Sequence, residues 1–473
     1  MNYDNPQSRN EAILQNILGA DNVLEPPQSR TEAALTAILN GEEYTGEAKS
    51  RVEMLLKEIS QQGGGNVDVE ALAVDQNGTY TAPEGTAYSP VTVNVSGGGG
   101  QEVPEKDVNF IDYDGTVLYS YTAQEALALT ALPTNPSHEG LTAQGWNYTL
   151  AEVKTEVNAV GGATVGQMYV TDDGKTRIYL DIPEDTPTNR LTFNMTIQST
   201  VSGNLVIDWG DGTSITSGET YAANINHTYQ SGGKYTITVA VTQGTAAIIS
   251  LLFGDYYCAQ AWIKKIHVGA SITGFKVGAL VSNLECLTIP SGATIEGASA
   301  FASCYSLKCI IIPSGTTSIG QTAFVECSSL KKISIPPTVM SIAKNCFYKS
   351  SAIERIDLPY SITSIKDYLF FNCFNLKRCN IPSSITTIKD SAFSYCYTMG
   401  AAVIPANVTT INGSAFFGSG IGEYHVKPIA PPTITPTSLA VGDGTKIYVP
   451  AASLETYKTA TNWSSYASKM VGE

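Results

Sequence analysis

The C-terminal half of the chain repeats one pattern of apolar and polar positions. An Ile-Pro or Leu-Pro dipeptide recurs every 23 residues, and a phenylalanine recurs with the same period. Self-similarity at such a period predicts a solenoid, because one repeat cannot bury its apolar side without a neighbour. The prolines are Pro290, Pro313, Pro336, Pro359, Pro382 and Pro405, and the phenylalanines are Phe301, Phe324, Phe347, Phe370, Phe393 and Phe416.

One repeat shows how its side chains are expected to point. Leu330, Ile333 and Ile335 form the inward edge of a short strand, and Ile342 and Phe347 fill the opposite wall. Cysteines stand in one column of the repeats, which predicts buried free thiols rather than a disulfide framework. The column contains Cys304, Cys327, Cys373 and Cys396, and Ser350 interrupts it.

These repeats resemble the BspA-like leucine-rich repeats of bacterial surface adhesins and of proteins from gut bacteria and their phages. The resemblance rests on the unit S-L-K-x-I-x-I-P-x-x-x-T-x-I-x-x-x-A-F-x-x-C. It implies a leucine-rich-repeat solenoid over residues 244–473, which starts with degenerate rungs at 244–285. The last residues resemble the terminal cap of such arrays, whose helix would shield the final apolar rung.

The first 62 residues contain three copies of a short helical pattern. SRNEAIL, SRTEAAL and SRVEMLL start 21 residues apart, and each carries the S-x-x-E of a capped helix N-terminus. Helices of about ten residues are marginal alone in water. We therefore expect segment 1–62 to form a three-helix bundle, or to serve in docking and oligomerisation. The residues expected to dock on a partner are Ser8, Arg9, Leu14, Ser29, Arg30, Leu35, Ser50 and Arg51.

Glycine-rich breaks separate two further modules, at residues 66–96 and 103–182. The first is expected to be a small β module, because its valines alternate. In the second, NFIDYDGTVLYS matches the nucleophile motif of haloacid-dehalogenase-type phosphatases, whose chemistry needs further groups and a larger α/β sheet. We expect Asp112 and Asp114 to lie in a hairpin turn instead. The later stretch ALPTNPSHEGLTAQGWN resembles internalin-type B repeats, which implies a small β module.

Residues 187–243 contain W-G-D-G-T at Trp209–Thr213 and H-T-Y followed by G-K-Y-T-I-T-V. Both stretches resemble the polycystic-kidney-disease (PKD) domain, an immunoglobulin-like β-sandwich, which implies a core position for Trp209 and a structural role for His227. Turn chemistry explains Asp208 and Asp211 better than a calcium site does. The predicted fold class is therefore multidomain and mainly β. It joins a short N-terminal helical repeat, small β modules, an Ig-like PKD β-sandwich and a C-terminal leucine-rich-repeat solenoid.

The chain has a formal net charge of −15, which argues against a nucleic-acid partner, since phosphate binding needs a basic face. Residues 1–100 have a balance of −9 and residues 286–473 of +4, so the two ends are expected to meet different partners. No apolar run is long enough to cross a membrane, and the N-terminus lacks a secretory signal. Four histidines without metal-ligand spacing or a catalytic triad predict no enzyme activity, no metal and no cofactor.

Two columns of the repeats carry the candidate ligand-binding residues. One column pair is basic, and a nearby column is aromatic at Tyr305, Phe374 and Tyr397. Together these columns suit anionic glycans, through charge and through stacking on the rings. A solvated charged face that keeps the solenoid soluble is the other interpretation. The predicted binding residues are Lys331, Lys332, Arg355, Lys377, Arg378, Tyr305 and Tyr397.

The N-terminal pattern and the NGTYTAPEGTAYSPVTVNV segment resemble fibre proteins of phages that infect Firmicutes, including head fibres. This resemblance implies a virion fibre, of the head or the tail. Its N-terminus would bind a capsid or tail protein, and its PKD and leucine-rich-repeat modules would bind a glycan or protein of the host surface. Such a fibre is expected at the virion surface as a homo-oligomer, and a trimer would add avidity. The alternative is a bacterial cell-surface BspA-like adhesin.

Overall fold

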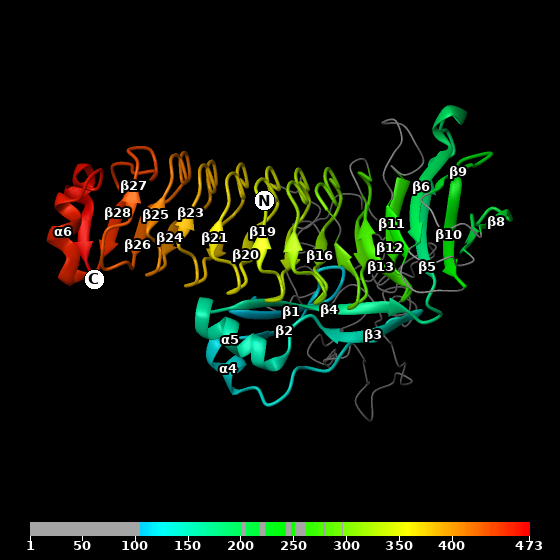
Figure 1. The fold of residues 1–473 in the computed structure, drawn as a ribbon, viewed down its shortest axis with the longest axis horizontal. Helices are drawn as coiled ribbons and strands as arrows, with labels where there is room; N and C mark the ends of the chain where they lie inside the picture. The colour runs from blue at the N-terminus through cyan, green and yellow to red at the C-terminus, as the bar shows by residue number, and fades with distance from the viewer. Residues whose placement is uncertain are drawn as a thin grey trace, which may run out of the picture. The chain divides into compact units, whose positions relative to one another are not determined.

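The computed structural model describes residues 105–199, 205–217, 223–242, 247–250, 262–277, 281–295 and 297–473. These residues belong to one compact unit, Glu102–Glu473. The predictions for segments 1–62 and 66–96, including the docking residues, lie outside the described residues. In the described part the chain is mainly β, with few helices and a C-terminal solenoid (Figure 1).

The first described element group is a four-stranded sheet with two helices, here called the α/β layer (residues 105–171). Its strand order is β2-β1-β4-β3, in which β1 pairs in parallel with β4 and the other pairs are antiparallel. Both helices begin with a reciprocal capping box, at Thr122 with Glu125 and at Thr149 with Glu152. The elements are β1 (Val108–Ile111), β2 (Val117–Tyr121), α4 (Ala123–Ala128), β3 (Leu141–Trp146), α5 (Leu150–Val160) and β4 (Ala163–Thr171).

Strand alternation gives the sheet of the α/β layer two different faces. Phe110 and Val165 point into a core with the helices, where Trp146 and Val153 also lie. The opposite face of β4 is turned to the solenoid. The two helices correct the expectation of a purely β module here, because the T-x-x-E caps stabilise helix N-termini between the strands.

The next strands form two sheets that share one hydrophobic core. One sheet has the order β14-β12-β5-β10-β7-β8 and the other β15-β13-β11-β6-β9. Their strands are β5 (Thr176–Ile182), β6 (Thr192–Ser199), β7 (Leu205–Asp208), β8 (Ser214–Ser217), β9 (Ala223–Thr228), β10 (Gly233–Val241), β11 (Ala247–Ser250), β12 (Ile263–His267), β13 (Ile272–Lys276), β14 (Cys286–Thr288) and β15 (Thr294–Ile295), with a short 3-10 helix η2 (Thr188–Arg190).

Both sheets continue into the solenoid without a break. β12 pairs antiparallel with β5 and parallel with β14, and β11 pairs antiparallel with β6 and parallel with β13. Strand β5 lies within segment 103–182, yet it pairs with β10 and β12. The boundary near residue 182 therefore does not separate two sheets, because β5 is shared by the segments on either side of it.

The solenoid itself is a stack of parallel rungs in which a strand residue pairs with the one 23 positions later, as Ile310 does with Ile333, or 22 positions later between β24 and β26. The inward positions Leu330, Ile333, Ile335, Ile342 and Phe347 are all buried, which confirms the predicted columns. The strands are β16 (Cys309–Ile311), β17 (Ser318–Ile319), β18 (Lys332–Ser334), β19 (Ser341–Ile342), β20 (Arg355–Asp357), β21 (Ser364–Ile365), β22 (Arg378–Asn380), β23 (Thr387–Ile388), β24 (Ala401–Ile404), β25 (Thr410–Ile411), β26 (Glu423–Val426), β27 (Thr433–Ile434) and β28 (Lys446–Val449).

Two ladders run through the solenoid core. The recurring phenylalanines stack face to face from Phe301 to Phe416, with neighbouring ring centroids 5.2 to 5.6 Å apart. The column cysteines are buried free thiols, as predicted. Cys327, Cys373 and Cys396 each donate to the carbonyl of a phenylalanine in the preceding rung, as Cys373 Sγ does to Phe347 O at 3.1 Å. These carbonyls also accept a backbone amide, so each thiol adds a second donor that links neighbouring rungs.

A terminal cap closes the last rung. It contains η4 (Ala451–Ser453), α6 (Leu454–Thr459), η5 (Ser464–Lys469) and β29 (Met470–Gly472), and β29 pairs in parallel with β28. Trp463 and Tyr457 are buried in the shared core, and the Trp463 indole N–H donates to the Pro432 carbonyl at 2.7 Å. The cap removes the final apolar rung from water, as expected of a solenoid end.

Candidate ligand-binding surfaces of the solenoid

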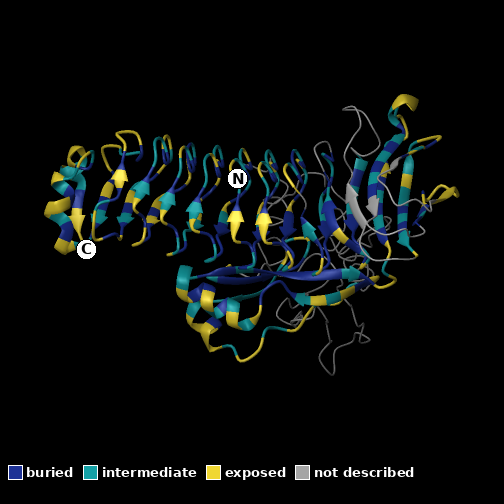
Figure 2. Ribbon diagram, in the orientation of Figure 1, coloured by how far each residue is buried: buried dark blue, intermediate teal, exposed yellow. Residues whose placement is uncertain are grey.

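The α/β layer covers the outward strand face of the first rungs. Strand β4 crosses β14, β16, β18 and β20, and Figure 2 shows it buried along most of its length. The fit is close because Gly166 has no side chain, since a Cβ there would come within 2.5 Å of Ile311. Met168 and Ile111 pack on Ile311 as well. This part of the strand face is therefore occupied by the chain itself.

Buried polar contacts fix the register of this docking. The Tyr148 hydroxyl donates to the Ile335 carbonyl at 2.5 Å, and the Asn147 amide donates to Ser334 Oγ at 2.9 Å. Ser334 in turn donates to the Thr164 carbonyl at 2.6 Å. Because every one of these groups is removed from water, a shift of the layer by one rung would leave several of them unpaired.

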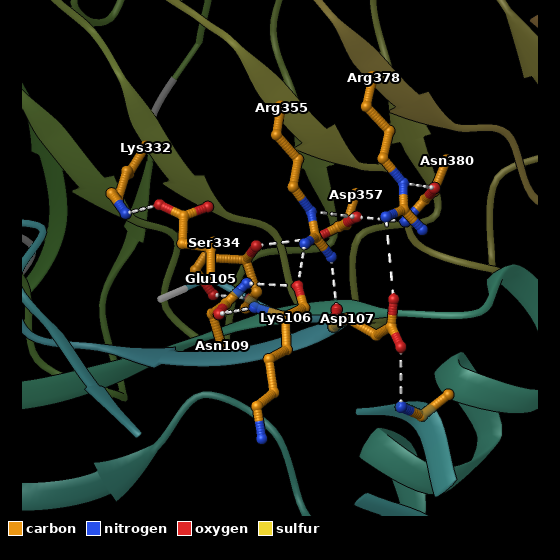
Figure 3. Close-up of polar contacts among 12 residues, drawn as sticks. Glu105, Lys106, Asp107, Asn109, Lys332, Ser334, Arg355, Asp357, Arg378 and Asn380 are labelled. Carbon is orange, nitrogen blue, oxygen red and sulfur yellow. Dashed lines mark hydrogen bonds and ion pairs between the residues drawn. The ribbon is translucent and has the colours of Figure 1, made fainter. Parts of the chain in front are cut away.

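The strongest charged contacts of this interface involve the predicted basic stripe (Figure 3). Arg355 donates to the carbonyls of Lys106 and Asp107 and forms a 3.2 Å ion pair with the buried Asp357. The Asp357 carboxylate also accepts from the hydroxyl of Thr164 at 2.7 Å. A guanidinium with several donors in a fixed plane suits this set of carbonyl and carboxylate acceptors.

Two further cations of the stripe contact the start of the α/β layer. Lys332 pairs with Glu105, and Arg378 lies 3.8 Å from the Asp107 carboxylate. With the layer docked, Lys332, Arg355 and Arg378 therefore contact the chain's own carboxylates and carbonyls, and of the three the Arg378 side chain stays the most open to solvent, at 48% exposure.

The remaining predicted binding residues lie elsewhere on the solenoid surface. Lys377 is exposed and pairs with Glu354 at 2.7 Å, and Lys331 is exposed beside the covered rungs. Tyr305 is exposed and stacks on no other ring of the described residues, so we leave it out of the candidate site, whereas Tyr397 stacks on Phe374. The predicted residues therefore fall into three groups. Lys332, Arg355 and Arg378 contact the α/β layer, Lys331 and Lys377 are exposed cations, and Tyr305 and Tyr397 stand in an aromatic column.

The phosphatase-like motif lies in the turn between β1 and β2, so the predicted hairpin is confirmed. Asp112 is buried and accepts from the Tyr169 hydroxyl at 2.8 Å, and its second oxygen lies 2.7 Å from His138 Nε2. The bond to Asp112 raises the pKa of His138. Asp114 accepts from the Thr116 amide within the turn. Both carboxylates are thus engaged in holding the hairpin.

The W-G-D-G-T turn has the same structural character. Asp208 and Asp211 accept from backbone amides of the turn, and Asp211 also lies 2.7 Å from His227 Nε2. His227 stacks on the buried Trp209 at 4.7 Å between ring centroids. Across the described ranges, no group of three or more His, Cys, Asp or Glu residues is placed to hold a metal ion. Nor is any helix in those ranges long and apolar enough to span a membrane.

A cluster of exposed and half-buried aromatic rings covers one edge of the later rungs, here called the aromatic surface. Tyr348 stacks on Phe371 at 5.0 Å, and Phe374 stacks on Tyr397 at 5.5 Å. Tyr395 joins the two pairs through edge contacts with Phe371 and Tyr397. The complete set is Tyr348, Tyr368, Phe371, Phe374, Tyr395, Tyr397 and Phe417.

The fold does not need aromatic residues at these positions, as the chain's own earlier repeats show. Where a later repeat has Phe371 or Phe417, earlier repeats have Ala302 or Val325, and where one has Tyr397 an earlier repeat has Ser328. The solenoid core is complete without them, because the buried phenylalanine and cysteine ladders already fill it. Exposed apolar clusters of this kind mark interaction sites more often than isolated exposed side chains do.

Two rings of the aromatic surface also stand at strained backbone positions. Tyr368 and Tyr395 have φ angles of 56° and 61°, in the left-handed region that bulky residues rarely adopt. The equivalent positions of the other repeats share this conformation with varied residues, among them Thr322, Glu326 and Lys349, so it is a property of the repeat itself.

Comparison with protein families gives one match. Residues 293–423 match the model of the BspA type leucine rich repeat region in six copies. Residues 293–423 are BspA-type leucine-rich repeats. A comparison with curated proteins gives no match.

Solved structures with similar segments include bacterial leucine-rich-repeat proteins. A T. pallidum leucine-rich-repeat protein is 24% identical over 38% of this chain and 77% of its own, with a TM-score of 0.27. A leucine-rich cell surface protein from Faecalibacterium prausnitzii is 21% identical over 44% of this chain and 68% of its own, with a TM-score of 0.30. TM-scores this low support no comparison of overall shape. The BspA-type assignment rests on the repeats.

Most of the aromatic surface was absent from the residues predicted from sequence. Only Tyr397 was predicted to bind ligand, and Phe374 was noted in its column. The signal for the others was present in the repeat alignment: Tyr348, Phe371 and Phe417 each directly follow the recurring phenylalanine. An exposed ring beside a buried one is hard to recognise from apolar pattern alone.

Proposed function

We propose that this chain is a cell-surface binding protein of the adhesin type, and that the aromatic surface contacts its ligand. The observation that carries the proposal is the exposed, mutually packed ring cluster on rungs whose fold does not require it. Tyrosine in such clusters supplies large contact area with little side-chain entropy to lose, as at other binding hot spots. The BspA-type repeats fit this proposal, and a leucine-rich cell surface protein is among the similar structures.

The test is binding of the full chain, displayed on beads, to a panel of immobilised polysaccharides and extracellular-matrix proteins. Phe374→Ala and Tyr397→Ala should each weaken the binding that the wild-type chain shows by about tenfold or more. Tyr305→Ala is the matched control, because Tyr305 stands in the same repeat column and is similarly exposed but lies outside the cluster. Equal binding by all four chains would refute a role of the aromatic surface in adhesion.

We propose no catalytic activity, metal or cofactor for this chain. Asp112, the residue equivalent to a phosphatase nucleophile, is buried with its carboxylate held by Tyr169 and His138. An attacking carboxylate must instead reach its substrate. Phosphatase activity that disappears on Asp112→Asn would overturn this part of the proposal.

A second proposal is the virion fibre, which the sequence pattern of segment 1–62 favours. In that case the N-terminal repeats would bind a capsid or tail protein, and a trimer would give the tip avidity. The two proposals differ in location, so immunogold electron microscopy with antibody against residues 187–473 separates them. Gold on the bacterial surface supports the adhesin, and gold on phage particles supports the fibre.

We further propose that residues 187–243 are a PKD-like sandwich that joins the α/β layer to the solenoid. The buried Trp209, its stacking on His227 and the hydrogen bond from the Tyr229 hydroxyl to the Trp209 carbonyl fit this proposal. An experimental structure in which strand order and connections differ from a PKD domain would remove it. The binding role of the solenoid does not depend on this point.

A further inference from the structure

The aromatic surface has polar as well as apolar chemistry. Four of its rings are tyrosines: Tyr348, Tyr368, Tyr395 and Tyr397. Among the residues that the structure describes, the hydroxyls of these tyrosines have no hydrogen-bond partner. A ligand at this surface would therefore meet ring carbons and hydroxyl groups side by side. Partners with alternating C–H and O–H groups match that combination.

The surface is also electrically balanced. Lys349 lies over the Tyr348 ring at 5.5 Å from its centroid, but it pairs with Glu326 at 3.0 Å. Lys377 likewise pairs with Glu354 at 2.7 Å. The most basic part of the solenoid contacts the α/β layer instead, through Arg355 and its neighbours. Because Lys349 and Lys377 are both paired with glutamates, neither offers a free charge to an anionic ligand at these rings.

Tyr397 is the most accessible ring of the cluster. It stacks on Phe374 with one face, and it is 56% exposed. On the following rung, Gly418 leaves room for the Tyr395 ring, since a Cβ there would come within 2.8 Å of that ring. Gly420 packs against the backbone of Tyr397, where a Cβ would collide with the Tyr397 carbonyl. The two glycines thus allow close packing of this rung on Tyr395 and Tyr397, while the Tyr397 ring stays exposed to a ligand.

We infer that the aromatic surface binds a neutral polysaccharide chain, with a sugar ring packed on the exposed ring of Tyr397. The array follows the rungs of the solenoid, so the other rings offer their edges and hydroxyls to further units of a linear polymer. Weak contacts of this kind add up along a repeating ligand. The inference rests on the proposed function of the aromatic surface and specifies its ligand class.

The test uses an array of neutral polysaccharides (glucan, mannan, xylan and galactan), anionic ones (hyaluronan, heparin and alginate) and matrix proteins. The full wild-type chain should bind at least one neutral polysaccharide, with an affinity that does not fall as salt is raised. Tyr397→Ala should weaken that binding about tenfold or more. Tyr397→Phe should retain most of it, and Tyr305→Ala all of it.

The other outcomes separate this inference from the proposed function. Binding only to a matrix protein, lost in Tyr397→Ala, would overturn the polysaccharide inference and leave the adhesin proposal standing. Binding only to anionic polysaccharides, with strong salt dependence, would also overturn the inference. It would indicate that lysines such as Lys349 and Lys377 bind the ligand. If no neutral polysaccharide on the array binds the wild-type chain, the inference is wrong. Circular dichroism of each variant establishes that it keeps its fold.

Discussion

Arg355 is predicted to be the residue whose loss most weakens docking of the α/β layer. It donates to two carbonyls of the layer and neutralises Asp357, which is 3% exposed. Replacement by Met keeps an unbranched side chain of similar reach but leaves that carboxylate buried without its cation. Removing one partner of a buried ion pair costs about 3–5 kcal/mol. Because the Arg355 side chain is itself 15% exposed, we expect the lower end of this range.

Hydrogen–deuterium exchange of the full chain measures the loss of docking free energy at the interface of the α/β layer. Opening of the α/β layer breaks the hydrogen bond from the Tyr360 amide to the Glu156 carboxylate, so protection of this amide should fall by roughly a hundredfold or more in Arg355→Met. Amides of the solenoid core around Phe347 should keep their protection. Adding Asp357→Asn to the variant removes the buried charge and should restore much of the loss.

The control is Lys377→Met, which breaks an exposed pair with Glu354 on the same solenoid. Exposed pairs contribute at most about 1 kcal/mol, so protection should change by less than about tenfold. If Arg355→Met lowers protection no more than Lys377→Met does, the contacts at Arg355 do not hold the layer in place.

Three further predictions concern the interface and the core. Burial raises the pKa of Glu156, which accepts from the Tyr360 amide, from 4.5 to about 8. The folded state therefore binds this proton more tightly than the unfolded state, and stability should fall as pH rises from about 4.5 to 8. Glu156→Gln should flatten that fall in thermal unfolding scans, and an unchanged slope would contradict the assignment. Gly166→Ala should cost about 1–3 kcal/mol through collision with Ile311, with partial rescue by Ile311→Ala in a double-mutant cycle, whereas additive effects would argue against the contact. Cys373→Ser should be tolerated, because Ser350 already donates to the Phe324 carbonyl in the same column. Cys373→Val should cost about 0.5–1.5 kcal/mol more in urea unfolding by removing one of the two donors to the Phe347 carbonyl, and equal stability of the two variants would show that this bond is unimportant.

The solenoid could be predicted from the sequence because its period predicts both the fold and the positions whose side chains point inward. Ile333 and Phe347 recur at fixed positions, and a strict period leaves only one way to bury them together. The hairpin at Asp112 was equally predictable, since Asp-Gly supplies the turn residues between two strands. In both cases local pattern and tertiary structure agree.

Docking of the α/β layer could not be predicted, because it depends on tertiary contacts between segments more than 150 residues apart. Nothing in the repeat marks Arg355 as a partner for the backbone of residues 106 and 107, and a row of exposed cations looks the same in sequence. The two helices of the layer, in contrast, could be predicted from the sequence. Thr122 with Glu125 and Thr149 with Glu152 carry the same capping signal that predicts helices in segment 1–62.

The most direct test of a ligand-binding solenoid compares three full-length chains on one immobilised panel. Wild type, Tyr397→Ala and Tyr305→Ala are titrated against each polysaccharide and matrix protein under the same conditions. We predict that wild type and Tyr305→Ala bind the same component with equal affinity, and that Tyr397→Ala binds it about tenfold or more weakly. If the three isotherms superimpose on every component that binds, the aromatic surface is not the binding site.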